Sequence, residues 1–201
     1  ELSPATTTQL YNYLGLTYYL TGQKAKALES LNKAKDLAAL SDESHRLLAV
    51  LLLDEGRIED AILELTSIIQ SGKASADDYN NLGTAYSRQE NYDSASRAFE
   101  KVLSLEPKHL VAIQNLGLAY IQLGQYEDAE NNLRKLVRLQ PTDSKAFYNL
   151  GFVQEQLQKY TAALNSYNKA KELGYADTAK IDQAIEYLSS KTSTSDQKTS
   201  E

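Results

Sequence analysis

Residues 76–109 read ADDYNNLGTAYSRQENYDSASRAFEKVLSLEPKH, and their pattern recurs throughout the chain. Starting at Thr8, the same arrangement of apolar and small residues returns every 34 positions, five times, without an insertion or deletion. Self-similarity at a fixed period of this length is typical of stacked structural units, each of which buries its open face on its neighbour. The sequence therefore predicts a repeat protein with an extended surface, which favours binding over catalysis.

Three columns of the repeat describe how each unit is packed. The columns are a leucine, the small residue that follows it, and a later alanine: Leu14, Leu48, Leu82, Leu116 and Leu150; Gly15, Ala49, Gly83, Gly117 and Gly151; Ala27, Ala61, Ala95, Ala129 and Ala163. Glycine inside a helix costs about 1 kcal/mol relative to alanine. A glycine repeated at one column therefore indicates two helices that approach too closely for a larger side chain.

The third repeat resembles the tetratricopeptide repeat more fully than the others do. The matching positions are Tyr79, Leu82, Gly83, Tyr86, Ala95, Phe99 and Pro107. The resemblance covers residues 8 to about 177 and implies an all-α, right-handed superhelical solenoid of five antiparallel helix pairs, with a C-terminal capping helix. The second repeat departs most from the motif, with His45, Ala49, Leu52 and Lys73, and the fifth departs at Gln154 and Gln158.

The register sets the expected boundaries. We expect a flexible lead-in over residues 1–7, an array over 8–188 and a disordered tail over 189–201, because the tail has no apolar residue. The array is expected to comprise repeats 8–41, 42–75, 76–109, 110–143 and 144–177 and a capping helix, 178–188.

Composition excludes several classes of function. The chain has 201 residues, no cysteine and a net charge of −6, with no continuous basic stripe, so a nucleic-acid partner is not expected. It has no apolar stretch long enough for a transmembrane helix. It has no phosphate-binding glycine motif and no set of nucleophile, base and orienting group, so neither an enzyme nor a cofactor is expected. We interpret His45 and His109, the two histidines, as structural rather than metal-binding.

The chain begins at Glu1 and contains no methionine. We interpret this start as the result of removal of an initiator residue or trimming of a longer chain. An upstream signal or lipid anchor is compatible with it, so the compartment stays open between the cytoplasm and an exported location.

The resemblance implies that ligands bind along the first helices. The sixth register position holds Tyr13, Leu47, Asn81, Asn115 and Asn149, and the three asparagines form a possible ladder. Each amide carries both donors and an acceptor, so a ladder can pair with the backbone of an extended peptide, as in tetratricopeptide proteins with asparagine ladders. The expected groove comprises Asn12, Tyr13, Leu16, Arg46, Asn80, Asn81, Thr84, Gln114, Asn115, Leu118, Tyr148, Asn149 and Phe152.

The predicted function is a protein–protein interaction scaffold whose groove binds an extended segment or a helix of another protein. Two alternatives stay open: a regulatory or targeting domain trimmed from a larger enzyme, and a self-associating assembly module. A clamp for the C-terminal carboxylates of chaperones is not expected, because Asn12, Asn80 and Gln114 stand where that clamp needs basic residues and Arg46 stands alone.

Every repeat has apolar spacing near 3.6 residues and none alternates like a strand. We therefore expect far-ultraviolet circular dichroism to give an almost purely helical spectrum. A substantial β-sheet signal would contradict the predicted architecture.

Overall fold

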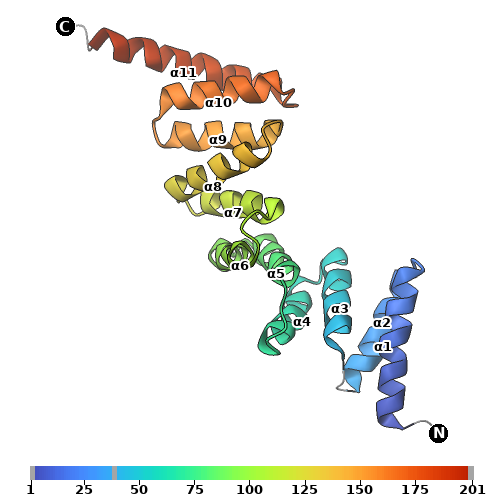
Figure 1. Cartoon of the computed structure of the whole chain (residues 1–201). Helices are drawn as coiled ribbons and strands as arrows, with labels where there is room; N and C mark the ends of the chain where they lie inside the picture. Colours follow the sequence, from blue (N-terminus) through green and yellow to red (C-terminus); the bar gives the residue numbers. More distant parts are fainter. Residues whose placement is uncertain (1–2, 38–39, 199–201) are drawn as a thin grey trace. The chain divides into compact units, whose positions relative to one another are not determined.

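A computed structural model describes residues 3–37 and 40–198, and within these it contains eleven α-helices and no β-strand (Figure 1). The helices are α1 (Pro4–Leu20), α2 (Lys24–Asp36), α3 (Asp42–Asp54), α4 (Ile58–Gln70), α5 (Ala76–Arg88), α6 (Tyr92–Leu105), α7 (Leu110–Gln122), α8 (Tyr126–Leu139), α9 (Ser144–Gln156), α10 (Tyr160–Glu172) and α11 (Thr178–Lys198). The predicted all-α class is confirmed.

The chain divides into two compact units, Glu1–Val102 and Leu103–Glu201, with the boundary inside α6. The unbroken register predicts a single array, and within its length the structure forms two compact units. Helices α1 to α5 and most of α6 form the first unit, and α7 to α11 form most of the second.

The first helix of each repeat begins at a capped position. The side chains of Ser41, Ser75, His109 and Asp143 accept hydrogen bonds from backbone N–H groups at the starts of α3, α5, α7 and α9. These four residues are 34 positions apart, and each satisfies a donor that the first helical turn leaves without an intrahelical partner. The sequence period therefore fixes where the first helices start.

Within the first unit, each first helix packs beside the second helix that follows it. Four residues of α2 are buried at helical spacing, namely Ala27, Ser30, Leu31 and Ala34. Leu31 joins Leu48 and Leu52 of α3 in one apolar cluster. A second cluster joins Leu65 and Ile68 of α4 to neighbouring helices. The core of this unit thus lies between the two helix layers.

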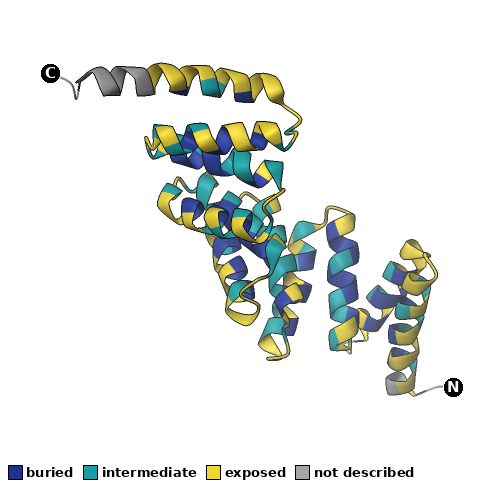
Figure 2. Cartoon of the chain, turned by 45° about the horizontal axis from the view of Figure 1, so that its top comes forward, coloured by how far each residue is buried: buried dark blue, intermediate teal, exposed yellow. Residues whose placement is uncertain are grey.

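The second unit is built in the same way. In Figure 1, α10 lies between α9 and α11, and both pairs are in contact. Tyr167 of α10 packs with Ile181 and Leu188 of α11, while Leu133 of α8 packs with Leu150 of α9. Figure 2 shows buried residues where these helices meet, and exposed residues along much of α11. The amphipathic pattern of α11 therefore directs Ile181 and Leu188 inward.

The small-residue column lies at the closest approach of the two helices in a repeat. A Cβ added to Gly83 would lie 2.6 Å from Cε1 of Phe99, and one added to Gly151 would lie 2.8 Å from Cδ1 of Tyr167. At Gly117 the nearest atom, Cγ of Leu133, would be 3.2 Å away. The glycine column is therefore a packing requirement, and it is weakest at Gly117.

The ends of the chain differ from the sequence prediction. Helix α1 begins at Pro4 rather than Thr8, since the Ser3 hydroxyl accepts a hydrogen bond from Thr6 N–H and proline is favoured in the first helical turn. The predicted flexible lead-in over residues 1–7 is thus wrong for residues 4–7, and residues 1–2 lie outside the described part.

The predicted disordered tail, 189–201, is also wrong over most of its length. Helix α11 continues past the buried Leu188 as far as Lys198. Extending a helix that is already packed requires no new nucleation. The hydroxyls of Ser189 and Ser190 also donate to the carbonyl groups of Ile185 and Tyr187. Residues 199–201 lie outside the described part.

The glycine geometry predicts unequal effects for equal substitutions. Gly83→Ala should lower the free energy of unfolding by about 1–3 kcal/mol, because its Cβ would overlap the Phe99 ring. Gly117→Ala should be near neutral, because Leu133 can shift slightly and alanine gains about 1 kcal/mol of helix propensity. Urea unfolding of both variants measures the difference, and equal effects would contradict this packing.

Candidate peptide-binding surface

The register position before the asparagine ladder proves to link one repeat to the next. The amide of Asn12 donates to the Thr8 carbonyl at 3.0 Å and accepts from the backbone N–H of Ser41 at 3.1 Å. Asn12 is only 8% exposed. The prediction that Asn12 faces a ligand is therefore wrong: its side chain is used to hold the start of the next repeat.

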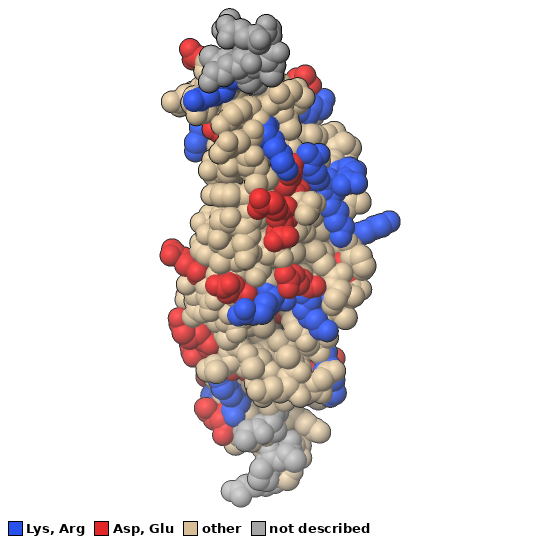
Figure 3. All heavy atoms as spheres, turned by 90° about the vertical axis from the view of Figure 1, so that its left-hand side faces the viewer, with Lys and Arg blue, Asp and Glu red and all other residues tan. Residues whose placement is uncertain are grey.

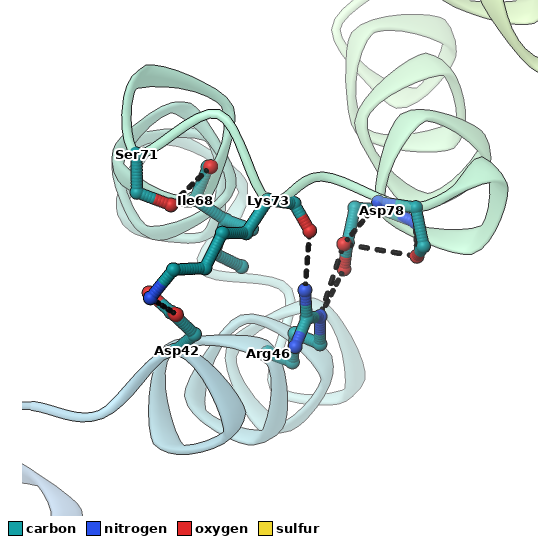
Figure 4. Close-up of polar contacts among 7 residues, drawn as sticks. Asp42, Arg46, Ile68, Ser71, Lys73 and Asp78 are labelled. Carbon is teal, nitrogen blue, oxygen red and sulfur yellow. Dashed lines mark hydrogen bonds and ion pairs between the residues drawn. The ribbon is translucent and has the colours of Figure 1, made fainter.

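Arg46 has a similar role one repeat further on (Figure 4). Its Nε lies 3.0 Å from both carboxylate oxygens of the buried Asp78, and its Nη2 donates to the Lys73 carbonyl at 2.8 Å. Lys73 reaches back to Asp42 at 2.6 Å. The Arg46 guanidinium is thus held between α3 and the start of α5, and its charge is balanced within the protein.

The two aromatic groove candidates of the fifth repeat are also largely occupied by packing. Tyr148 stacks on Tyr175 with ring centroids 4.4 Å apart. Phe152 meets Tyr126 edge-on at 6.5 Å and contacts the core of the second unit. Burial, with nearby acidic groups, raises the pKa of Tyr148. Both side chains are half-buried, so part of each ring is used in packing and its role in ligand binding stays a prediction.

The ladder position remains open to solvent in part. Tyr13 is 70% exposed, whereas Leu47 is 8% exposed. Asn81, Asn115 and Asn149 are half-buried. Within residues 3–37 and 40–198, their side chains make no hydrogen bond to protein. Asn81 belongs to the first unit and the other two to the second, on α7 and α9. Their alignment across both units stays a prediction.

The remaining candidates lie on the first helices and are half-buried. They are Asn80, Thr84, Gln114 and Leu118. The Thr84 hydroxyl donates to the Asn80 carbonyl at 2.9 Å, so it is used within α5. The Asn80 side-chain oxygen is buried without a hydrogen-bond partner in the described part of the chain.

A cavity of about 520 Å³ lies between α1 and α3, inside the first unit. Its walls are Leu16, Tyr19, Leu20, Glu43, Arg46, Leu47 and Val50. Leu16 and Arg46 are among the predicted site residues, whereas Leu20 and Glu43 are not. The spacing of Leu16, Tyr19 and Leu20 indicates from the sequence that they share one face of a helix, but the cavity beside them is found only in the structure.

The buried carboxylates of second helices have structural partners. Glu64 of α4 accepts hydrogen bonds from Lys35 at 2.6 Å and is bonded to His45 at 2.7 Å. Glu130 of α8 accepts from Arg134, Gln154 and Lys159. Burial alone would raise the pKa of each carboxyl, but the hydrogen bonds outweigh it and hold both pKa values below the usual one.

Both histidines are accounted for by these structural contacts. His45 bonds to Glu64, and Nδ1 of His109 accepts from the backbone N–H of Ala112 at 3.1 Å, as an N-cap. In the described residues, no three histidine or acidic side chains converge into a group suited to a metal ion. No helix in the described part is long and apolar enough to cross a membrane.

Comparison with known proteins agrees with the helix pairs and their period. One tetratricopeptide repeat model matches residues 86–150, and another matches residues 8–39 and 144–173. The chain belongs to the tetratricopeptide repeat family. Human protein O-mannosyl-transferase TMTC1 is 32% identical over 107 residues, which make up 53% of this chain and 12% of the transferase.

Two solved structures show the same fold. MamA is 23% identical, with a TM-score of 0.76 over 87% of this chain and 96% of MamA. YrrB is 18% identical, with a TM-score of 0.79 over 88% of this chain and 90% of YrrB, and is described as a TPR protein with an unusual peptide-binding site. At these identities the likeness establishes the solenoid fold and leaves the ligand open.

The buried carboxylates predict a specific acid sensitivity. Because the folded pKa values of Glu64 and Glu130 lie below the usual 4.5, their ionised forms stabilise the fold above that pH. This contribution is lost as the pH falls below 4.5 through the folded pKa values. In urea melts from pH 6 to pH 3, the Glu64→Gln, Glu130→Gln double variant should therefore lose less stability than the wild type.

The control for this experiment is Glu127→Gln, which changes an exposed carboxylate on α8. It should follow the wild-type curve. If the double variant loses as much stability as the wild type on acidification, these ion pairs do not govern the acid response.

Proposed function

We propose that this protein is a non-enzymatic interaction scaffold that binds an extended segment of another protein along its first helices. Family membership and the solenoid fold support a binding role, because stacked repeats present extended surfaces. YrrB, a fold neighbour, is described as having a peptide-binding site. These likenesses support binding in general, and the choice of surface rests on this chain's own residues.

The observation that carries the proposal is the set of three amides at one register position. Asn81, Asn115 and Asn149 are half-buried, make no hydrogen bond to protein in the described residues, and repeat at intervals of 34. A peptide backbone offers one donor and one acceptor per residue, which a side-chain amide can match. An extended segment fits this arrangement better than a helix, whose backbone groups are already paired.

A second candidate is that the chain forms the binding module of a longer protein. The match to the human transferase favours it, because the matched region makes up only 12% of that protein. The complete reading frame around the chain decides between the two: additional domains in frame would support the module, and flanking stop codons would contradict it.

The proposed function is tested by selecting binders from a display library of random 12-residue peptides, using the full chain as bait. The Asn81→Ala, Asn115→Ala, Asn149→Ala triple variant should keep its fold but bind the selected peptides more weakly. Each lost amide contact contributes about 0.5–1.5 kcal/mol, so three should weaken binding at least about tenfold. Because the amides would bond to the peptide backbone and not to its side chains, the triple variant should lose a similar amount of affinity for peptides of different sequence.

The matched control is Asn131→Ala with Asn168→Ala, which removes two exposed amides from the second helices α8 and α10. It should leave affinity unchanged. If the library yields no binder, the scaffold proposal fails; if the triple variant folds and binds normally, the ladder is not the binding surface.

A further inference from the structure

The cavity between α1 and α3 has a composition that restricts what can enter it. Helix α1, with the sequence PATTTQLYNYLGLTYYL, carries no charged side chain. It nevertheless exposes large apolar groups, among which Tyr13 is 70% and Leu20 is 84% exposed. Exposed apolar surface that adjoins a cavity marks interaction sites. One wall of this cavity is therefore apolar and uncharged along its length.

The opposite wall, on α3, carries two ionisable groups, one of which is paired within the protein and one of which is not. The charge of Arg46 is balanced by Asp78, and its Nη2 is bonded to the Lys73 carbonyl. Glu43 lies three residues before Arg46, so the two occupy the same face of the helix. Glu43 is exposed and forms no ion pair within residues 3–37 and 40–198. It is thus the unbalanced charge of the cavity.

The repeat that supplies this wall is acidic overall, although Glu43 is the acidic residue that lines the cavity itself. The second repeat, residues 42–75, contains seven acidic and three basic residues, a net charge of −4. Asp42 beside Glu43 is already paired with Lys73. An acidic side chain entering the cavity would meet Glu43 without a free cation, whereas a basic one would gain an ion pair. Charge complementarity therefore favours a basic occupant.

Size supports a peptide side chain as the occupant. A volume of about 520 Å³ falls within the range of about 300–1,000 Å³ seen for small-ligand sites, so it can hold one bulky aliphatic or aromatic side chain and part of its neighbour. Leu16 and Val50 are half-buried and offer apolar surface to a ligand, while Leu47, 8% exposed, lines the same cavity.

From this geometry we infer that the cavity between α1 and α3 is an anchor site for a partner segment in which a bulky apolar residue stands next to lysine or arginine. The inference rests on the proposed function, because it names the chemistry of the segment that the scaffold binds. The apolar side chain contacts Leu16, Leu20 and Leu47, and its basic neighbour pairs with Glu43.

The test uses three pools of labelled 12-residue peptides that share the same random uncharged flanks and differ in a fixed central pair: Leu-Arg, Leu-Glu or Ser-Arg. Fluorescence anisotropy with the full chain gives their affinities. The Leu-Arg pool should bind at least about tenfold more tightly than the Ser-Arg pool, because the Ser-Arg peptides lack the leucine side chain that the cavity would bury. The Leu-Arg pool should bind about two- to fivefold more tightly than the Leu-Glu pool, because a partly exposed ion pair between arginine and Glu43 contributes only modestly to affinity.

Two variants at exposed positions separate the two contacts. Glu43→Lys should reverse the charge preference, so that Leu-Glu binds more tightly than Leu-Arg. Leu20→Ser should lower the affinity for both the Leu-Arg and the Leu-Glu pools, and Leu-Arg should still bind more tightly than Leu-Glu. The matched control is Glu127→Lys, at the second residue of α8, which should leave all three affinities unchanged.

The outcomes distinguish this inference from the function on which it rests. If all pools bind equally and Glu43→Lys changes nothing, the anchor site is wrong while the scaffold stands. If no pool binds and library selection fails as well, both are wrong. If light scattering shows a dimer that Leu20→Ser dissociates, a second copy of the chain occupies the cavity, and the inference is overturned.

Discussion

The close approach of the two helices in each repeat is the constraint on which the rest of the structure depends. A Cβ at Gly83 would overlap Phe99, and one at Gly15 would lie 2.6 Å from Leu31. At this separation the apolar face of each second helix is buried against its partner, as at Ala95 and Ala129, which are fully buried. The other face of the first helices carries the half-buried amides of Asn81, Asn115 and Asn149.

Links between repeats use polar side chains in a way that limits the binding surface. Asn12 and Arg46 hold the start of the next repeat, while Glu64 and Glu130 connect second helices to neighbouring elements. Losing one partner of such a buried contact leaves a charge or amide unsatisfied, which costs more than the contact itself contributes. These residues belong to the architecture, so the proposed ligand sites are limited to the amides of Asn81, Asn115 and Asn149 and the cavity beside Glu43.

Much of the fold could be predicted from the sequence because it depends on local patterns. The 34-residue period and the capping residues at Ser41, Ser75 and Asp143 determine where first helices begin, and the glycine column indicates the close contact with the second. The termini were misjudged because composition was used in place of these local signals. Ser3 followed by Pro4 is itself a helix-start pattern, whereas the extension of α11 beyond Leu188 depends on continuation of a packed helix.

The candidate site was less predictable for a physical reason. A register position indicates which side of a helix a residue occupies but not what its side chain reaches: Asn12 bonds to the next repeat, and Tyr148 stacks on Tyr175. The cavity depends on how far α1 and α3 stand apart, so Leu20 and Glu43 became candidates only in the structure. Helical spacing alone could have placed Leu20 beside Leu16, but not beside an opening.

The central claim is that partners bind on the first helices, and hydrogen–deuterium exchange with a selected peptide tests it directly. We expect added peptide to slow exchange in α1 and α3, and in α5, α7 and α9 where the amides engage it, with little change in α2, α4 and α8. Protection confined to the second helices or to α11 would contradict the claim and place the binding surface elsewhere.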